Sequence, residues 1–177
     1  MRIVVSGTTG TGKSTLAAEL ARRLRLPCVE LDALHFLPGW TPVEPALFRR
    51  TVDAATAGEG WVVAGNYSVV RDLTWGRADT IVWLDYPFGF TARRLLRRTL
   101  RRALTQELLW GTNRESFRQS FFTRDSILLW FLKTHGKRRH DFPPALAEQV
   151  ARGACVVRLR SQAATEAWLA GLAPEAA

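Results

Sequence analysis

A glycine-rich octapeptide near the start of the chain has the residue types and spacing of a phosphate-binding loop. Residues 7–14 read Gly-Thr-Thr-Gly-Thr-Gly-Lys-Ser and fit the P-loop pattern G-x-x-x-x-G-K-[ST]. In such a loop the backbone N–H groups surround a phosphate, the lysine reaches the terminal phosphates and the serine ligates Mg²⁺. The candidate ATP-binding residues are Gly7, Thr8, Thr9, Gly10, Thr11, Gly12, Lys13, Ser14 and Thr15, with Ser14 as the candidate metal ligand. The alternative is a glycine-rich turn that matches by chance.

The segments on either side of this loop favour a functional P-loop. Residues 2–6 are short, apolar and β-branched, which predicts a buried strand. After the loop, Leu16, Leu20 and Leu24 recur at helical spacing. A helix that begins at the loop directs its partial positive charge at a bound phosphate. The order strand, loop and helix is therefore the one that the chemistry needs.

Further along the chain, strand-like runs alternate with helix-like runs, which predicts an α/β protein with a parallel sheet and helices on both faces. The expected strands cover residues 2–6, 28–32, 61–66, 80–85 and 154–159. The expected helices cover residues 14–24, 45–57, about 90–109, 115–122, 125–135, 143–152 and 161–172. Residues from about 103 to 141 contain no expected strand, and we interpret them as a helical lid inserted over the site.

Length and composition place further bounds on the protein. The chain has 177 residues, of which 47% are hydrophobic, and we expect one domain over residues 1–177 with a sizeable core. We see no signal peptide and no run of about 18 apolar residues, so we expect a cytoplasmic protein that is not associated with a membrane. Cys28 and Cys155 lack metal-ligand spacing and are expected to be reduced, buried thiols.

Positive charge is concentrated in one part of the chain. The net charge is +9, and residues 93–139 hold 13 Lys and Arg against three acids. Arginine outnumbers lysine 22 to 3, and arginine is the residue best suited to bidentate phosphate contacts. A GC-rich genome would produce the same bias without any function. The charge therefore indicates an anionic ligand only in combination with the motifs.

Four groups of residues after the P-loop resemble a known family. They are Leu31-Asp32-x-x-His35 with Pro38-Gly39-Trp40, Gly65-Asn66-Tyr67 with Arg71-Asp72, Trp83-Leu84-Asp85, and Arg94-x-x-x-Arg98 with Asn113-Arg114-Glu115. With the P-loop, they make the chain resemble the adenylate-kinase-like P-loop kinases, a plan shared by gluconate and shikimate kinases. It is most similar to the small bacterial proteins labelled DNA topology modulation protein.

This resemblance implies a P-loop three-layer fold with a five-stranded parallel sheet in the order 2-3-1-4-5, a substrate-binding segment and a lid. It implies ATP-dependent phosphoryl transfer to a small-molecule or nucleotide acceptor, with ATP and Mg²⁺ as cofactors. We expect a monomer or a weak homodimer. In that strand order Cys28 and Cys155 begin opposite edge strands, roughly 19 Å apart at about 4.8 Å per strand, so we expect no disulfide between them.

The resemblance also assigns roles to arginines. Arg94 and Arg98 match a pair of which one stacks on the adenine and one meets the phosphates, and i,i+4 spacing places both on one helix face. Arg114, Arg138 and, more weakly, Arg139 are candidates for closing over the site from the lid. The alternative for the helix arginines is a solvated basic face made of Arg93, Arg94, Arg97, Arg98, Arg101 and Arg102.

The acceptor side of the site is expected at the ends of the second and third strands. Asp32 is the candidate that accepts a hydroxyl proton or binds a Mg²⁺ water, or else it is a turn or capping residue. The candidate catalytic residues are thus Lys13, Asp32 and Arg98. We expect His35, Gly65, Asn66 and Tyr67 to contact the acceptor and Arg71 to meet its anionic group. His35 is equally explained by packing alone.

Asp85 and four tryptophans receive a structural interpretation. Asp85 follows an apolar strand as a Walker B acid does, but the corresponding acid in the adenylate kinase plan does not bind metal. The third strand ends in Gly65-Asn66 rather than in an acid, which departs from adenylate kinase. We expect the tryptophans to pack in the core, as aromatic residues usually do: Trp40, Trp61, Trp75 and Trp83.

A second function remains open at this stage, namely a nucleic-acid-binding or regulatory NTPase. The basic stretch from residue 93 to residue 139 would attract a polyanion without sequence preference. However, the sequence shows no helix-turn-helix, zinc finger or RNA-binding motif. The same charge also lies where a kinase lid needs it, and we favour the kinase.

Overall fold

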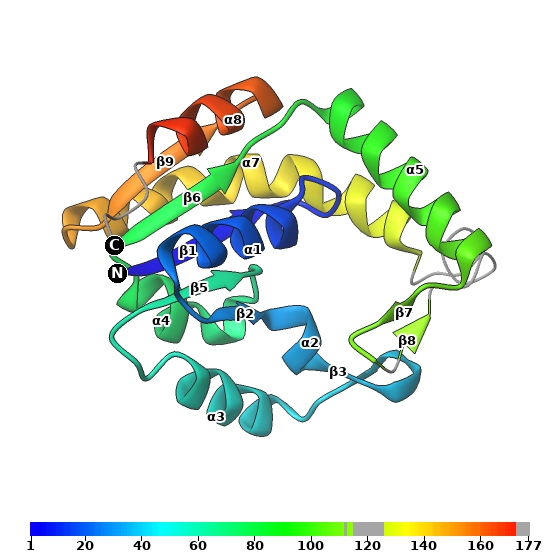
Figure 1. The fold of residues 1–177 in the computed structure, drawn as a ribbon, viewed down its shortest axis with the longest axis horizontal. Coiled ribbons are helices and arrows are strands. Elements are labelled where there is room, and N and C mark those ends of the chain that lie inside the picture. The colour runs from blue at the N-terminus through cyan, green and yellow to red at the C-terminus, as the bar shows by residue number, and fades with distance from the viewer. Residues whose placement is uncertain (112, 115–125, 173–177) are drawn as a thin grey trace.

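A central parallel sheet organises the computed structural model, which describes residues 1–111, 113–114 and 126–172 (Figure 1). Its strands are β1 (Arg2–Gly7), β2 (Cys28–Glu30), β5 (Trp61–Ala64), β6 (Thr80–Leu84) and β9 (Cys155–Leu159). They lie in the order β2-β5-β1-β6-β9 and all pair in parallel. Counted along the chain this is 2-3-1-4-5, so the predicted fold class and strand order are confirmed.

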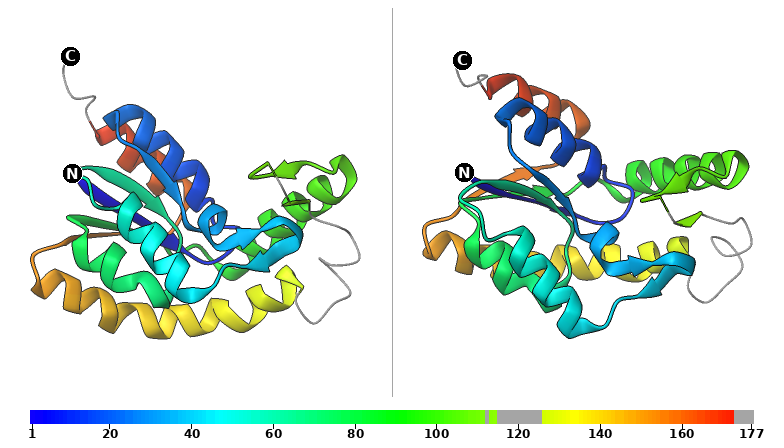
Figure 2. Two further views of the ribbon diagram at one scale, coloured as in Figure 1. Left: turned by 90° about the horizontal axis from the view of Figure 1, so that it is seen from below. Right: turned by 60° about the horizontal axis from the view of Figure 1, so that its bottom comes forward.

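Helices cover both faces of the sheet and give three layers (Figure 2). One face carries α1 (Lys13–Leu24) and α8 (Gln162–Gly171), and the other carries α3 (Pro45–Ala55), α4 (Arg71–Thr74) and α7 (Ile127–Ala151). The central strands are buried on both faces because successive side chains point to opposite sides. Val5 packs with Leu16 and Leu20, whereas Val4 packs in the cluster of Phe48 and Phe142.

Between β2 and α3 the chain forms a short irregular segment. It contains α2 (Leu31–His35), β3 (Phe36–Leu37), the 3₁₀ turn η1 (Pro38–Trp40) and β4 (Thr41–Pro42). The second strand therefore ends at Glu30, and Asp32 lies in the first turn of α2 rather than at the end of the strand as predicted. The chain turns here because Leu31 is buried against Gly65, at the end of the neighbouring strand. Two further 3₁₀ turns, η2 (Ser68–Val70) and η3 (Trp75–Arg77), flank α4.

The long helix α5 (Phe88–Thr105) projects away from the sheet and carries a small hairpin at its far end (Figure 1). The hairpin consists of β7 (Leu108–Leu109) and β8 (Asn113–Arg114), which pair antiparallel. The prediction of a lid without strands is therefore wrong at this point. The predicted helix over residues 115–122 lies outside the described residues.

One continuous helix replaces two predicted ones. The segments 125–135 and 143–152 are parts of α7, which runs through Pro143 and Pro144. Prolines disfavour a helix interior because they remove a hydrogen bond and crowd the preceding turn. Here Phe142 and Leu146, on either side of them, are buried in the core and hold the helix together. The predicted lid boundary at residue 141 thus falls inside a helix whose second half belongs to the sheet layers.

Two predictions about burial are corrected by the structure. Cys28 and Cys155 are both free and both exposed, because they begin the two edge strands of the sheet. Trp61, Trp75 and Trp83 are buried as expected, whereas Trp40 is only half-buried. Across residues 1–111, 113–114 and 126–172, we find no helix with both the length and the apolar character needed to cross a membrane.

Candidate phosphate and acceptor site

The loop between β1 and α1 has the backbone geometry of an anion site. Gly12 takes a left-handed conformation, with φ of 93°, and α1 begins directly after it without an acidic residue or a side-chain cap in its first turn. The first N–H groups of α1 are therefore available to a phosphate. Gly10 also has positive φ, 84°, and a Cβ there would lie 2.9 Å from the Cβ of Leu95 in α5. Only glycine allows the loop to pass this close to α5.

Contacts within the loop hold it in shape. The carbonyl of Thr8 accepts hydrogen bonds from the Thr11 hydroxyl at 2.8 Å and from Lys13 Nζ at 3.1 Å. Asn66, in the loop that follows β5, donates through Nδ2 to the Gly7 carbonyl at 2.9 Å and accepts from the Gly7 N–H at 3.3 Å. Asn66 thus supports the P-loop through both of its side-chain hydrogen bonds. Its contact with the acceptor stays a prediction.

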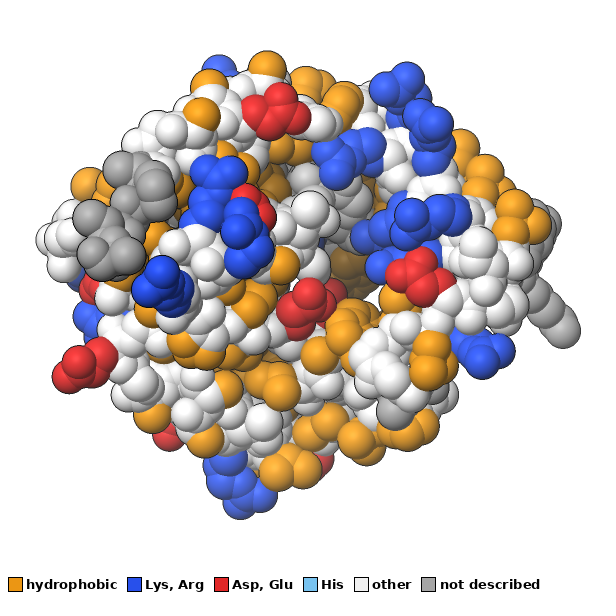
Figure 3. Space-filling model, in the orientation of Figure 1, with side chains coloured by type: hydrophobic (Ala, Val, Ile, Leu, Met, Phe, Trp, Pro, Cys, Tyr) orange, Lys and Arg blue, Asp and Glu red, His pale blue; other side chains and the backbone are white. Residues whose placement is uncertain are grey.

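Lys13 lies at the centre of several charged groups. Burial lowers the pKa of Lys13 to about 8; the carboxylate of Asp32 opposes this shift, and the cations Arg138 and Arg98 add to it. These groups come from α1, α2, α7 and α5, which are distant in the sequence. Figure 3 shows this face hollowed at its centre, with Lys and Arg side chains gathered towards α5. The structure therefore brings Lys13, Asp32, Arg98 and Arg138 together.

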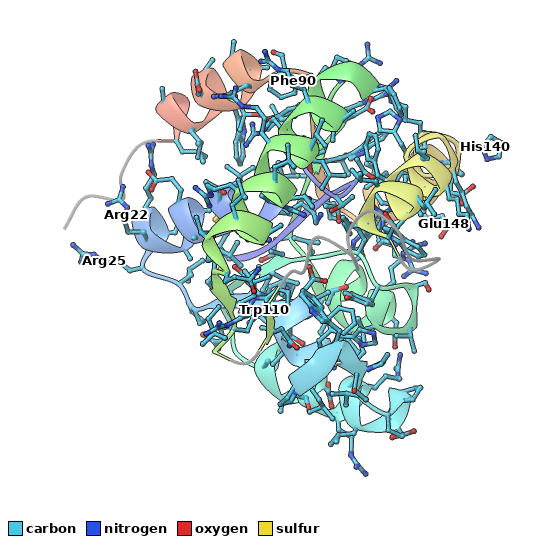
Figure 4. All side chains as sticks on the ribbon, turned by 90° about the vertical axis from the view of Figure 1, so that its right-hand side faces the viewer. Arg22, Arg25, Phe90, Trp110, His140 and Glu148 are labelled. Atoms are coloured by element: carbon cyan, nitrogen blue, oxygen red, sulfur yellow. The ribbon has the colours of Figure 1, made fainter. Side chains whose placement is uncertain are left out.

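On α5, Arg94 and Arg98 share the face that looks towards the loop. The Arg94 guanidinium donates to Gln162 Oε1 of α8 at 3.2 Å, lies 5.6 Å over the ring of Phe90, and approaches Gly12. Phe90 lies between α5 and α8 (Figure 4). The residues on the other side of this helix, Arg93, Arg97 and Arg101, are exposed.

Arg138 reaches the P-loop from α7, which lies on the other face of the sheet from α1. Its Nη1 donates to Thr8 Oγ1 at 3.2 Å and to the Gly7 carbonyl at 3.5 Å. Burial lowers the pKa of Arg138, and Asp32 and Tyr67 oppose this shift. A guanidinium remains charged at neutral pH even so. Arg138 therefore places a half-buried positive charge beside the phosphate-binding backbone.

The acceptor side is built on Asp32 and Tyr67. The Tyr67 hydroxyl donates to Asp32 Oδ1 at 2.6 Å. Burial, followed by the negative charge of Asp32, raises the pKa of Tyr67, which keeps the phenol protonated as a donor. His35 packs its ring 4.6 Å from that of Tyr67 and 4.8 Å from that of Phe48, and burial lowers its pKa. His35 is thus neutral at pH 7, its buried Nδ1 has no hydrogen-bond partner among the residues that the structure describes, and its contact with the acceptor stays a prediction.

Three other predicted acceptor residues have described contacts of a different kind. The Arg71 guanidinium sits 4.9 Å over the ring of the buried Trp75. Gly65 serves the close approach of Leu31, since a Cβ there would lie 2.8 Å from the Cβ of Leu31. Arg114, in the hairpin, accepts through its backbone carbonyl a hydrogen bond from Trp40 Nε1.

A set of contacts between the lid hairpin and the segment 36–42 was not predicted. The Trp40 N–H donates to Asn113 Oδ1 at 2.9 Å, Trp40 Nε1 donates to the Arg114 carbonyl at 3.0 Å, and Asn113 Nδ2 donates to the Leu37 carbonyl at 3.1 Å. Trp110 Nε1 donates to Glu30 Oε2 at 3.0 Å. We call these contacts the lid clasp; Trp110 is labelled in Figure 4.

Two tryptophans of the lid clasp adopt an unusual backbone. Trp40 and Trp110 have φ of 61° and 48°, a left-handed conformation that costs a bulky residue about 1–3 kcal/mol. Their rings meet edge to face with centroids 5.7 Å apart. The only signal for this in the sequence is that each lies beside a glycine in a turn-like stretch, Gly39-Trp40 and Trp110-Gly111.

The residues at the loop fit a magnesium ion that is held mainly by phosphate. In the described part of the chain no group of three or more His, Cys, Asp or Glu side chains is placed to hold a metal. Ser14 is exposed at the second position of α1. Magnesium often takes one or two protein ligands and completes its shell with phosphate oxygens and water. Ser14 as the protein ligand of such an ion stays a prediction.

Comparisons with known proteins agree with this architecture. The profile of the "ATPase family associated with various cellular activities (AAA)" matches residues 3–85, from β1 to the end of β6. The curated proteins include no significant match. The match covers less than half of the chain, so it shows a likeness to these ATPases over that part, and neither comparison points to the DNA topology modulation proteins.

Solved structures match the whole chain. A sugar kinase from Janibacter sp. HTCC2649, unliganded, has a TM-score of 0.54 at 18% identity and covers 98% of this chain and 95% of its own. Shikimate kinase from Bacteroides thetaiotaomicron has a TM-score of 0.56 at 16% identity and covers 97% of this chain and 96% of its own. A gluconokinase from Sinorhizobium meliloti 1021 has a TM-score of 0.52 at 21% identity and covers 97% of this chain and 93% of its own. At these identities the likeness shows the fold alone, which this chain shares with the three kinases named.

Proposed function

We propose that this protein transfers the γ-phosphoryl group of ATP to a small hydroxyl-bearing molecule. One observation carries the proposal: Lys13, Arg98 and Arg138 converge with Asp32 at the P-loop from four separate elements. Phosphoryl transfer requires positioning and neutralisation of charge more than covalent chemistry. Three cations beside the carboxylates of Asp32 and Glu30 supply both.

On the nucleotide side, each residue has a distinct task. The N–H groups at the start of α1 and Lys13 bind the phosphates, and Ser14 holds Mg²⁺, which when bound neutralises charge on the β- and γ-phosphates. Arg94 lies between Gly12 and Gln162, where it covers the nucleoside end of ATP. Arg98 and Arg138 stabilise the charge that develops as the γ-phosphoryl group moves.

On the acceptor side, Asp32 accepts the proton of the attacking hydroxyl. The hydrogen bond from Tyr67, 2.6 Å long, orients one carboxylate oxygen and leaves the other for the acceptor. The attacking oxygen forms its bond to the γ-phosphorus as the bond to ADP breaks, and the proton passes to Asp32. The lid clasp joins the hairpin to the segment that follows α2, and we expect closure of the lid there to exclude water and so limit hydrolysis of ATP.

The solved structures named above act on sugars, shikimate and gluconate according to their descriptions, which supports a hydroxylated acceptor over a nucleotide. We further propose that residues 1–177 form one domain with its lid at about 103–141. We propose that it works in the cytoplasm as a monomer or weak homodimer with ATP and Mg²⁺.

The test is ATP consumption against a panel of sugars, sugar acids, polyols, nucleosides and nucleoside monophosphates. We expect ADP to form only with one chemical class of acceptor, and we expect its rate to change little between low and physiological salt. Formation of ADP that no acceptor stimulates but DNA does would contradict the proposal. Steep loss of that activity with salt would then identify contacts with many phosphates.

A second function, nucleic-acid binding coupled to ATP, has one observation in its favour. Arg93, Arg97 and Arg101 form an exposed basic stripe along α5. Hydrogen exchange separates the two functions. For the kinase we expect slower exchange in β7 and in residues 127–141 with a non-hydrolysable ATP analogue and Mg²⁺, because ligand charge offsets repulsion among the arginines. Protection by duplex DNA alone would favour nucleic-acid binding.

The low pKa of Lys13 predicts how ATP affinity depends on pH. The cationic lysine is needed for binding, and its pKa in the free protein is about 8. Affinity should therefore be level below that pH and weaken above it, by up to about tenfold per pH unit, until the higher pKa of the bound state is reached. Calorimetric titration with the ATP analogue at pH 7 and 9.5 should show proton uptake only at the higher value. Proton release there would contradict the assignment.

A further inference from the structure

A cavity of about 350 Å³ lies at the carboxyl ends of β6 and β9, and its wall includes one residue of α7. Five residues line it: Asp85, Pro87, Arg139, Arg158 and Arg160. Its volume falls in the range of small-molecule sites, and its place at the carboxyl edge of a parallel sheet is where ligands bind in such folds. We call it the arginine pocket.

Asp85 fixes two of the three arginines. Its side chain is only 4% exposed, and Oδ1 accepts from Arg139 Nε at 2.7 Å. Oδ2 accepts from Arg158 Nε at 3.0 Å and from Arg158 Nη2 at 2.6 Å. The Arg158 guanidinium also stacks 4.3 Å over the ring of Trp83. Both arginines are therefore held in place before any ligand arrives, which reduces the entropic cost of binding.

The pocket holds more positive charge than the carboxylate needs. One guanidinium would neutralise Asp85, yet three lie around it, the third with Arg160 Nε at 4.0 Å. The side chains of Arg139, Arg158 and Arg160 are 44%, 40% and 70% exposed, so each keeps N–H groups open to solvent. With Asp85 ionised, the pocket has a net charge of +2. That charge complements a phosphate dianion, whose oxygens arginine binds in bidentate fashion.

The arginine pocket contains no residue of the P-loop, although it adjoins the ATP site: Asp85 and Arg139 also line a small neighbouring pocket with Thr8 and Arg138. The P-loop is contacted by Arg94 from the side of α1 and α8 and by Arg138 from α7. Arg139, the next residue of α7, points its guanidinium at Asp85 instead. We propose that the arginine pocket is a second anion site, which binds the phosphate group of a small phosphate monoester or of free phosphate. The proposal does not depend on the kinase function.

The test keeps the P-loop filled. The full-length protein is saturated with a non-hydrolysable ATP analogue and Mg²⁺ and then titrated calorimetrically with inorganic phosphate or with glycerol 3-phosphate. Saturable binding is expected with the wild type. Arg160→Gln should weaken it by about tenfold, the low end for a charge-assisted hydrogen bond, while leaving the melting temperature unchanged because Arg160 is exposed. Tighter binding of glycerol 3-phosphate than of inorganic phosphate would identify a monoester as the ligand.

Arg50→Gln is the matched control, since Arg50 is an exposed arginine of α3 outside the pocket. It should bind both anions as the wild type does. Absence of saturable binding in the wild type would overturn the proposal, and so would binding that Arg160→Gln leaves unchanged. An oligonucleotide that binds through Arg160 when neither small anion does would also overturn it, in favour of a polynucleotide surface.

Discussion

Replacing Lys13 with methionine should abolish phosphoryl transfer and also make the folded protein more stable at pH 7. Methionine keeps the length of the side chain but removes the charge that reaches the phosphates. In the folded protein, burial lowers the pKa of Lys13 from 10.5 to about 8. The folded state thus holds this proton less tightly than the unfolded state, and the charged lysine destabilises the fold.

The sign of the pH dependence follows from this shift. The destabilisation is fully present below about pH 8 and disappears as the pH rises from there towards 10.5, because only the unfolded chain still binds the proton in that interval. The shift corresponds to at most about 3 kcal/mol, and solvent at the loop reduces it, so we expect a gain of about 1–3 kcal/mol at pH 7. Urea unfolding of wild type and Lys13→Met at pH 7 and 10 measures it, and the difference should shrink at the higher pH.

Lys133→Met provides the control for this experiment, because Lys133 is an exposed lysine on α7. It should leave both stability and turnover unchanged. Normal turnover in folded Lys13→Met would refute the assignment of the P-loop. A variant that is inactive but no more stable than the wild type would show that the charge of Lys13 is well solvated in the free protein.

Replacing Asp32 with asparagine should lower kcat by about 10²–10⁴-fold, the usual contribution of a general base, while changing ATP affinity little. Asparagine keeps the size of the side chain. It can still accept the hydrogen bond from Tyr67, which is 2.6 Å long in the wild type. It cannot accept the acceptor's proton at neutral pH. Steady-state kinetics, together with calorimetric titration of the ATP analogue, separates the two effects.

Tyr67→Phe is the matched control for the role of Asp32. It removes the hydrogen bond to Asp32 but leaves the carboxylate, so kcat should fall by only about tenfold, the value of one such bond. If Asp32→Asn keeps kcat within a few-fold of wild type, Asp32 is only a first-turn residue of α2. An equal loss in both variants would mean that Asp32 acts through the geometry of Tyr67 rather than as a base.

The sequence by itself determined the features that depend on residues close together along the chain. The P-loop is a local pattern of glycines, lysine and serine, and the spacing of Arg94 and Arg98 places them on one helix face. Buried strands alternating with amphipathic helices specify a parallel sheet. These signals act over a few residues, so the pattern of residue types is enough to find them.

Only the tertiary structure decided which partners meet across the chain. Asn66 forms a hydrogen bond with Gly7, 59 positions away in the sequence, and Arg138 forms one with Thr8, 130 positions away. Buried polar groups must find partners wherever the topology brings them, and no local period encodes that choice. Packing against the core likewise carried α7 through Pro143 and ended β2 before Asp32. The sheet order put Cys28 and Cys155 at exposed edges, because exposure depends on which strand has a neighbour rather than on residue type.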